Sequence, residues 1–233
     1  MRPTALAVPA GRGHDCAMPP TTAKAPGQGP KLDLRSVHRE LYSPSARVVS
    51  VVDVPDLAFT MLDGAIPPET APGDSEEFGR SIEAMYGIAY GVKLMSKLRR
   101  VDPIDFTVMA LEGLWWPAGA SPTTTGRFRL LMLQPDHITS EMVQTAAEQA
   151  DAKRPNPLLS RVRLERWKEG RCMQIMHVGP YADEGRTIER LSSFAAEHEC
   201  RLRGRHHEIY LGDPRRSRPE RLRTILRQPI AED

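Results

Sequence analysis

The sequence predicts an α+β fold in which one unit, strand-strand-helix-strand-strand, occurs twice around a central ligand cleft. The first observation is that short β-branched or apolar runs and helical periodicities recur in the same order in residues 47–134 and 161–228. The second is that one strand of each half carries an acid, Glu112 or Glu208, followed closely by aromatic residues. A pseudo-two-fold arrangement would bring these strands to one cleft, and such clefts commonly bind small ligands.

The first half begins with apolar strands and continues into a long helix. Its predicted elements are strands at 47–52 and 57–62, a helix from 74 to about 95, and strands at 106–116 and 127–134. The sequence Asp-Val-Pro-Asp at 53–56 predicts a hairpin turn between the first two strands. Acidic residues at 74–77 favour a helix start, and apolar residues recur at helical spacing from Phe78 onward.

The second half repeats this order after a linking helix. Its predicted elements are the linking helix from Thr139 to Ala150, strands at 161–167 and 171–178, a helix at 183–198, and strands at 205–211 and 221–228. Thr139 has the side chain of a good N-cap. The sequence Lys-Glu-Gly at 168–170 predicts a second hairpin turn. The strand at 205–211 therefore corresponds to the strand at 106–116 in the first half.

The N-terminal segment, residues 1–30, is dominated by Pro, Gly, Ala and Thr. Such a segment has too little apolar surface to offset the entropy lost on ordering, so we expect it to be disordered. Residues 31–233 are expected to form one domain, which is long enough to bury a sizeable core. Met18 lies within the segment and is an alternative translation start, which the intact mass of the natively expressed protein would establish.

The composition is that of an ordinary soluble globular protein, with 40% hydrophobic residues, 27% charged residues and a formal net charge of +2. Nine arginines lie between Glu199 and Gln228, but no nucleic-acid-binding module accompanies them, so we expect a solvated face. The three cysteines lack a CxxC pair, which favours a reducing cytosol and argues against zinc or a disulfide framework. No membrane span or secretory signal is evident. We expect a cytoplasmic monomer that acts without a cofactor.

The strand at 205–211 carries the clearest candidate chemistry. Alternation along a strand places His206, Glu208 and Tyr210 on one face, and His207 with two apolar residues on the other. If the first face is solvated, this trio is ordinary surface; if it lines a pocket, Glu208 is a candidate general base. A metal site is disfavoured, because His206 and His207 are adjacent on a strand and point apart.

Aromatic residues supply a candidate ligand slot. Trp115 and Trp116 are adjacent on a strand and face opposite ways, so alternation places Trp116 on the face of Glu112 unless a bulge intervenes. Tyr86 and Tyr90 are separated by one helical turn and either line the cleft or simply pack. No GxSxG, P-loop, GxGxxG or HExxH motif offers a different chemistry.

Three runs, at 111–116, 174–181 and 206–216, together resemble the GyrI-like small-molecule-binding family. The resemblance covers about residues 31–230 and implies the duplicated α+β fold, with a central aromatic cleft and an acid within it. The paired tryptophans and the His-His-Glu-Ile-Tyr run resemble the cyclopropanoid hydrolase branch. Proteins of that branch open the cyclopropane of DNA-alkylating natural products of the yatakemycin and duocarmycin type, and relatives serve as self-resistance proteins.

The resemblance implies a substrate that joins a cyclopropane to a cyclohexadienone, with water attacking the methylene carbon and leaving a phenolate. For this reaction Glu208 is the expected base, Tyr210 orients the water or donates a hydrogen bond, and Glu112 is a second carboxylate or a structural acceptor. The expected substrate-contacting residues are Trp115, Trp116, Tyr86, Tyr90, Tyr181 and His177. A strand histidine such as His177 is more often satisfied within the protein. No metal or covalent intermediate is required.

Two other functions stay open at this level. A non-catalytic module that sequesters or senses a hydrophobic, often cationic, drug would use the same aromatic slot without turnover. A gyrase-interacting inhibitor rests on the family name alone. The first alternative predicts stoichiometric protection with unchanged ligand recovered, whereas hydrolysis predicts a product one water heavier than the substrate.

Overall fold

The computed structural model of the protein describes residues 31–116 and 126–231 of the 233-residue chain. The predictions that residues 1–30 are disordered and that Met18 is an alternative start concern residues outside these ranges. Among the described residues, no helix is both long enough and apolar enough to cross a membrane.

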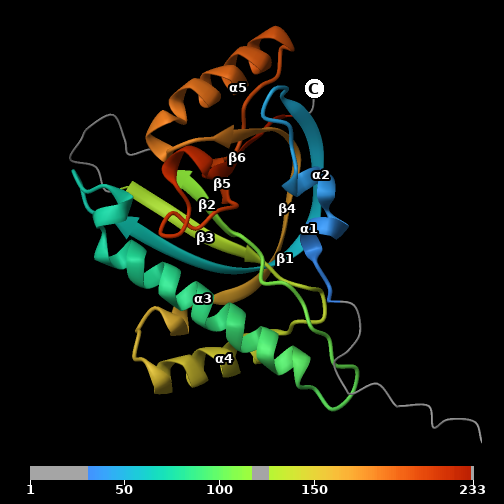
Figure 1. Ribbon diagram of the computed structural model, residues 1–233, viewed down its shortest axis with the longest axis vertical. Coiled ribbons are helices and arrows are strands. Elements are labelled where there is room, and N and C mark those ends of the chain that lie inside the picture. Colours follow the sequence, from blue (N-terminus) through green and yellow to red (C-terminus); the bar gives the residue numbers. More distant parts are fainter. Residues whose placement is uncertain (1–30, 117–125, 232–233) are drawn as a thin grey trace, which may run out of the picture.

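The described residues form a closed barrel of six antiparallel strands with helices on its outer surface (Figure 1). The strands follow one another around the barrel in the order β1-β3-β2-β5-β6-β4. Their bounds are β1 Ser50–Ile66, β2 Leu111–Trp116, β3 Gly126–Leu133, β4 Arg163–Val178, β5 His206–Tyr210 and β6 Arg223–Pro229. Closure removes the free sheet edges that would otherwise expose unpaired backbone groups.

Each half of the chain contributes a strand, a helix and two further strands, first β1-α3-β2-β3 and then β4-α5-β5-β6. β1 pairs with β4 and β2 pairs with β5, so equivalent strands meet twice, as a pseudo-two-fold arrangement requires. The duplicated α+β fold is therefore confirmed. The strands that carry Glu112 and Glu208 are equivalent and adjacent, which is also as predicted.

The two predicted hairpins are wrong, because each is one continuous strand. β1 runs for 17 residues through Pro55, and β4 runs for 16 residues through Gly170. The two strands pair with each other in one unbroken register. Pro and Gly can mark a bend in a strand as well as a chain reversal, and Gly170 has a φ of +74°, which glycine adopts without steric cost. The repeated unit is therefore strand-helix-strand-strand.

The strand predicted at 106–116 is also shorter than expected, because β2 begins only at Leu111. Phe106 instead forms an isolated parallel bridge with Leu32, near the start of the described chain. The Phe106 side chain is buried all the same, with 2% of its surface exposed. Its apolar neighbours thus reflect a buried connection that approaches the barrel, which periodicity alone does not distinguish from a strand.

The long helices of the described chain are α3 Glu76–Lys97, α4 Ser140–Lys153 and α5 Gly185–Glu197, and the short ones before the barrel are α1 Leu34–Val37 and α2 Arg39–Tyr42. Ser75 caps α3 by accepting a hydrogen bond from the amide of Phe78. Thr139 caps α4 as predicted, by accepting from the amide of Met142. α3 packs on β1 and β3 with α4 beside it, and α5 packs on β4 and β6 on the other side of the barrel (Figure 1).

The outer face of β2 and β5 lies between these two helical layers. Phe78 of α3 contacts Trp115 of β2, with ring centroids 5.6 Å apart. Tyr181, in the turn before α5, packs edge-to-face on Tyr210 of β5, with centroids 5.8 Å apart. Aromatic side chains from two helical segments therefore approach the same pair of strands, and this is where the candidate site lies.

Candidate functional site

Strand β5 presents two chemically different faces. His207 and Ile209 are fully buried on the inner face, in the barrel interior. His206, Glu208 and Tyr210 are half-buried on the outer face. The predicted alternation is confirmed, and the outer face carries a carboxylate, a phenol and an imidazole at spacings of two residues.

The pairing of β5 with β2 decides which tryptophan accompanies Glu208. Gly113 lies opposite Glu208 in the ladder, and Trp115 lies opposite His206. Directly opposite residues of an antiparallel pair share a face, so Trp115 is on the side of Glu208. The space over Gly113, which has no side chain, is taken up by the ends of the Trp115 and Tyr210 side chains.

A chain of hydrogen bonds joins three of these side chains. The indole Nε1 of Trp115 donates to Tyr210 Oη over 3.0 Å. Tyr210 Oη in turn donates to Glu208 Oε2 over 2.9 Å. A Cβ at Gly113 would lie 3.0 Å from both Trp115 Nε1 and Tyr210 Oη, so glycine is needed for this close approach. We call Trp115, Tyr210 and Glu208 the Trp–Tyr–Glu chain.

Burial controls the protonation of the acid at the end of this chain. Burial raises the pKa of Glu208 above the usual carboxyl range, and the hydrogen bond from Tyr210 offsets only part of this effect. His206 Nε2 lies 3.5 Å from Glu208 Oε1, too far for a well-formed hydrogen bond. Burial, with a smaller effect of His207, lowers the pKa of His206 to about 4, so this imidazole is neutral near pH 7. Glu208 Oε2 is therefore fixed, and Oε1 has no regular hydrogen bond within the described chain.

Of the predicted tyrosines, Tyr181 lies near this acid, Tyr86 lies near Tyr181, and Tyr90 lies further out. Burial raises the pKa of Tyr181, and the charges of Glu184 and Glu208 raise it further because all three groups are close. Tyr86 also acts on Tyr181, and it stacks on Tyr90 with ring centroids 6.4 Å apart. Tyr90 is 60% exposed, which places it at the periphery.

Glu112 lies on the inner face, away from Glu208. It pairs with Ile209 in the ladder and is fully buried. Its Oε1 accepts a hydrogen bond from Tyr42 Oη over 2.7 Å, and its Oε2 lies 2.9 Å from His207 Nε2. The prediction that Glu112 and Glu208 share one cleft is therefore wrong, because a difference of one residue in register places them on opposite faces. Glu112 occupies the position of a structural acceptor.

Trp116 follows Glu112 onto the inner face, as alternation predicts, and is separated from Trp115. Its ring packs against two arginines. The Arg205 guanidinium carbon is 3.7 Å from the Trp116 ring centroid, and that of Arg127 is 5.9 Å away. These are cation–π contacts, and they engage the Trp116 ring away from the Trp–Tyr–Glu chain.

A cluster of charged side chains fills the barrel interior behind β5. Its members are Glu112, Glu169, His207 and Arg227. His207 Nδ1 lies 3.1 Å from each carboxylate oxygen of Glu169, and Arg227 Nη1 lies 3.3 Å from Glu169 Oε2. Burial lowers the pKa of His207, but Glu169 and Glu112 outweigh it and raise the pKa to about 9. His207 is therefore protonated near pH 7, and the buried cluster holds the strand that carries the Trp–Tyr–Glu chain.

His177 holds the turn before α5. Its Nδ1 lies 2.9 Å from Thr187 Oγ1, and its Nε2 lies 3.1 Å from the backbone oxygen of Pro180. The side chain is 5% exposed. Both ring nitrogens are used within the protein, which leaves neither of them for a ligand.

Sequence reasoning missed Glu184, which lies between the 3₁₀ turn η3 (Tyr181–Asp183) and α5. The residue is 7% exposed, although it stands at a helix start where acids are usually solvated. Burial, and then repulsion from Glu208, raises its pKa to about 8. The sequence signal was its position just after the run at 174–181, but acids are common in the first turn of any helix.

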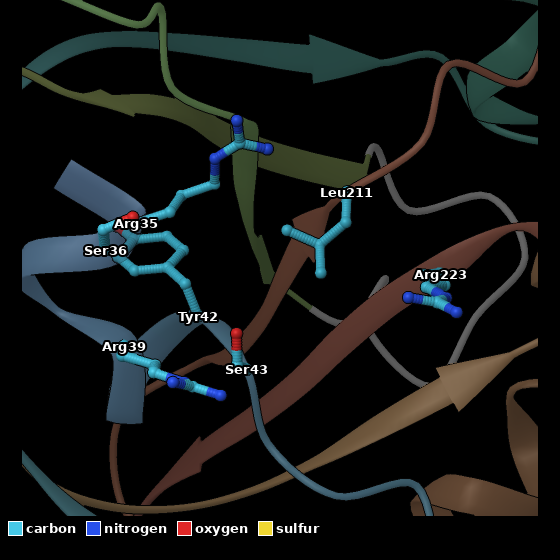
Figure 2. Close-up of a pocket in the computed structure, with 7 residues that line it drawn as sticks. All are labelled: Arg35, Ser36, Arg39, Tyr42, Ser43, Leu211 and Arg223. Carbon is cyan, nitrogen blue, oxygen red and sulfur yellow. The ribbon is translucent and has the colours of Figure 1, made fainter. Parts of the chain in front are cut away.

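The structure also shows a cavity of about 540 Å³ beside α1 and α2, rather than between the two acids. Its lining residues are Arg35, Ser36, Arg39, Tyr42, Ser43, Leu211 and Arg223 (Figure 2). Figure 2 shows Arg35 and Arg39 entering from the helical side, and Arg223 from the side of β6. Because Tyr42 also bonds to Glu112, this cavity borders the inner charged cluster and not the Trp–Tyr–Glu chain.

No metal centre stands out in the described chain. None of its His, Cys, Asp and Glu side chains form a group of three or more that could hold an ion. His206 and His207 face opposite sides of β5, as the alternation predicts.

Comparisons of this chain with known proteins identify a matching family and similar solved structures. The model of the GyrI-like small-molecule-binding domain matches residues 48–231. A solved hydrolase from Listeria innocua is 34% identical, with a TM-score of 0.73, over 86% of this chain and 100% of its own. An uncharacterized conserved protein from Listeria innocua is 36% identical, with a TM-score of 0.76 and the same coverage. The EcmrR C-terminal domain shares the fold alone, at 9% identity and a TM-score of 0.51 over 80% of this chain and 98% of its own. No curated protein matches.

The family match spans most of the chain and includes every strand of the barrel. The Listeria structures are similar over their whole length at more than 30% identity. This chain therefore belongs to the GyrI-like small-molecule-binding family.

Proposed function

We propose that this protein is a hydrolase that adds water across the electrophilic cyclopropane of DNA-alkylating cyclopropanoid cyclohexadienones. Its role would be self-resistance, because a compound whose ring has been opened can no longer alkylate DNA. The reaction class is supported by the related Listeria innocua structure that is described as a hydrolase and is 34% identical to this chain. The substrate class follows from the resemblance of the Trp-Trp and His-His-Glu-Ile-Tyr runs.

The observation that carries the proposal is the Trp–Tyr–Glu chain. Tyr210 holds Glu208 Oε2 at 2.9 Å, while Oε1 has no regular hydrogen bond within the described chain. Burial raises the pKa of Glu208, which makes its carboxylate a stronger base than a solvated one. A general base works best when its pKa lies close to the working pH, so this acid is suited to taking a proton from water.

In the proposed reaction, water attacks the methylene carbon of the cyclopropane and Glu208 takes one of the water protons. The new C–O bond forms as a C–C bond of the strained ring breaks. The electron pair of that bond moves into the dienone, which becomes an aromatic phenolate. No covalent bond to the protein forms at any step.

We place the planar substrate against Tyr86, Trp115 and Tyr181, which approach the outer face of β5 from both helical layers. Aromatic contacts contribute about 0.5–1.5 kcal/mol each beyond the apolar area they bury. Holding the reacting groups in register can supply a large part of the rate acceleration. Trp116 and His177 are left out of the proposed site, because their ring faces and ring nitrogens are engaged elsewhere.

The test is incubation of the purified protein with a duocarmycin-type cyclopropanoid, with the products followed by mass spectrometry. We expect a product one water heavier than the substrate, formed over many turnovers. Glu208→Gln keeps the shape of the side chain and removes the base, so we expect kcat to fall by about 10²–10⁴-fold. Glu220→Gln changes an exposed acid and is the matched control, with wild-type turnover expected. Full turnover by Glu208→Gln would refute the assigned base.

A non-catalytic drug-binding module is the second candidate, favoured by the description of the family as small-molecule-binding. Such a module would use the same aromatic residues to hold a planar drug. In the same incubation it predicts that the ligand is recovered unchanged, and that DNA is protected only until each protein molecule has bound one ligand. Catalytic turnover would exclude it.

A further inference from the structure

A second carboxyl group, Glu184, approaches the Trp–Tyr–Glu chain and has no role in the reaction described above. The residue is 7% exposed, and its Oε1 has no hydrogen-bond partner within the described chain. The same is true of Thr224 Oγ1 on β6. Thr224 is the ladder partner of Tyr210, so it lies on the same face as the chain. The Thr224 hydroxyl faces the Glu184 carboxyl group and acts on it as a weak hydrogen-bond donor, so both groups lie beside the proposed base without a hydrogen bond of regular geometry.

Unpartnered buried polar atoms are rare in folded proteins, because desolvation is costly unless a hydrogen bond replaces the lost water. Glu184 is also held firmly. Its amide donates to the backbone oxygen of Tyr181 over 3.2 Å, and its own backbone oxygen accepts from the Thr187 amide over 2.8 Å. His177 contacts Thr187 and fixes the same turn. A rigid, buried carboxyl group whose Oε1 has no regular hydrogen bond within the described chain is poised to bond to a ligand.

The groups that face Glu184 decide its protonation. From β5 they are Glu208 and Tyr210, from β6 Thr224, and from its own turn Tyr181. The neighbouring His206 is neutral near pH 7. No cation is among the described groups that act on Glu184, and the nearest charge, Glu208, is negative. The environment therefore favours the neutral, hydrogen-bond-donating form of this carboxyl group.

We propose that Glu184 is the general acid of the ring opening, donating its proton to the dienone oxygen of the substrate while Glu208 takes a proton from water. This inference rests on the proposed function. The electron pair of the breaking C–C bond delocalises onto the dienone oxygen, and this oxygen takes the proton of Glu184. The product therefore leaves as a neutral phenol. Glu208 gains one proton and Glu184 loses one, and exchange with solvent restores both. Protonating the leaving oxygen removes the cost of forming a phenolate beside a carboxylate.

The two carboxyl groups must then be in opposite protonation states, and the pH dependence reports this. Glu208 must be ionised, which sets the acidic limb of activity. Glu184 must be protonated, and burial together with Glu208 raises its pKa to about 8. The pH dependence of activity is therefore expected to be bell-shaped. Its alkaline limb lies near pH 8 and reports the interacting pair Glu184 and Glu208 rather than either group alone.

The experiment measures kcat/KM for a spirocyclopropyl cyclohexadienone on both sides of pH 8, in wild type, Glu184→Gln and Glu189→Gln. Glutamine donates a hydrogen bond but transfers no proton, and it mimics the neutral form, so the variant is expected to fold. We expect Glu184→Gln to lower kcat/KM by about 10²-fold near neutral pH and to abolish the alkaline limb. Glu189, an exposed acid of α5, is the matched control and should leave both limbs unchanged.

The outcomes separate this inference from the proposed function. Turnover with an unchanged alkaline limb in Glu184→Gln overturns the role of Glu184 and leaves the hydrolase standing. If wild type shows no turnover, the proposed function fails, and binding of the intact probe decides the donor role. Tryptophan fluorescence should then show binding that weakens above pH 8 in wild type and is independent of pH in Glu184→Gln. Equal pH dependence in both proteins overturns the donor role.

Discussion

The charged cluster inside the barrel leads to a sharp prediction about stability. Arg227 is 2% exposed, and its guanidinium contacts Glu169 Oε2 at 3.3 Å, Gln174 Oε1 at 3.0 Å and the backbone oxygen of Leu41 at 2.7 Å. Arg227→Met keeps an apolar stem of similar reach and removes the guanidinium. Glu169 then keeps only the imidazolium of His207 as a cationic partner, and Gln174 Oε1 and the backbone oxygen of Leu41 lose their donor.

The size of the effect follows from the burial of these charges. Removing one partner of a buried ion pair costs about 3–5 kcal/mol, because the other partner stays buried without compensation. For a protein of this length, each kcal/mol shifts the melting temperature by about 2–4 °C. The melting temperature of Arg227→Met should therefore fall by about 6–20 °C.

Urea and thermal unfolding followed by circular dichroism measure this change. Arg221→Met, at an exposed position, is the matched control and should stay within about 0.5 kcal/mol of wild type. Adding Glu169→Gln to Arg227→Met removes the carboxylate that has lost its guanidinium partner, so part of the lost stability should return. If Arg227→Met unfolds like wild type, charge balance is not what stabilises this interior. The same conclusion follows if the double variant loses more stability than the two single changes lose together.

Three further predictions concern pH, the second acid and the glycine under the chain. The pKa of His207 is raised to about 9 in the folded protein, so its stabilising contribution is complete below the unfolded pKa of about 6.5 and is lost as pH rises through 9. The melting temperature measured against pH should show this fall, and His207→Gln should flatten it. Glu112→Gln should lower the melting temperature, while kcat per folded molecule stays within about threefold of wild type. A loss of kcat as large as that expected for Glu208→Gln would reassign the role of base to Glu112. Gly113→Ala should push Trp115 and Tyr210 apart and lower kcat about tenfold, while circular dichroism shows an intact fold. An unchanged kcat would show that the Trp–Tyr–Glu chain plays no part in the mechanism.

Local spacing was enough to predict part of the site. Glu208 and Tyr210 are two residues apart, and successive side chains of any strand alternate, so their common face needs no tertiary information. The same rule correctly separated Trp115 from Trp116. The Thr139 cap followed from a side-chain oxygen placed before an apolar helical stripe.

Features that depend on pairing between strands could not be predicted in the same way. Whether Pro55 and Gly170 reverse the chain or bend a strand is decided by closure of the barrel, since both arrangements use the same residues. Glu112 and Glu208 were expected to converge because their strands are equivalent. A register offset of one residue instead sends them to opposite faces, and no spacing within either strand reveals that offset.

Sequence alone therefore determined which side chains share a strand face and that one unit of strands and a helix occurs twice, because strand alternation and helical periodicity are local properties of the backbone. The tertiary structure alone decided that Trp115, Tyr210 and Glu208 form one hydrogen-bonded chain, because its members come from strands 95 residues apart. It also decided that Glu184 is buried beside them, since only packing of a helix start against two strands removes water from an acid that would otherwise be solvated.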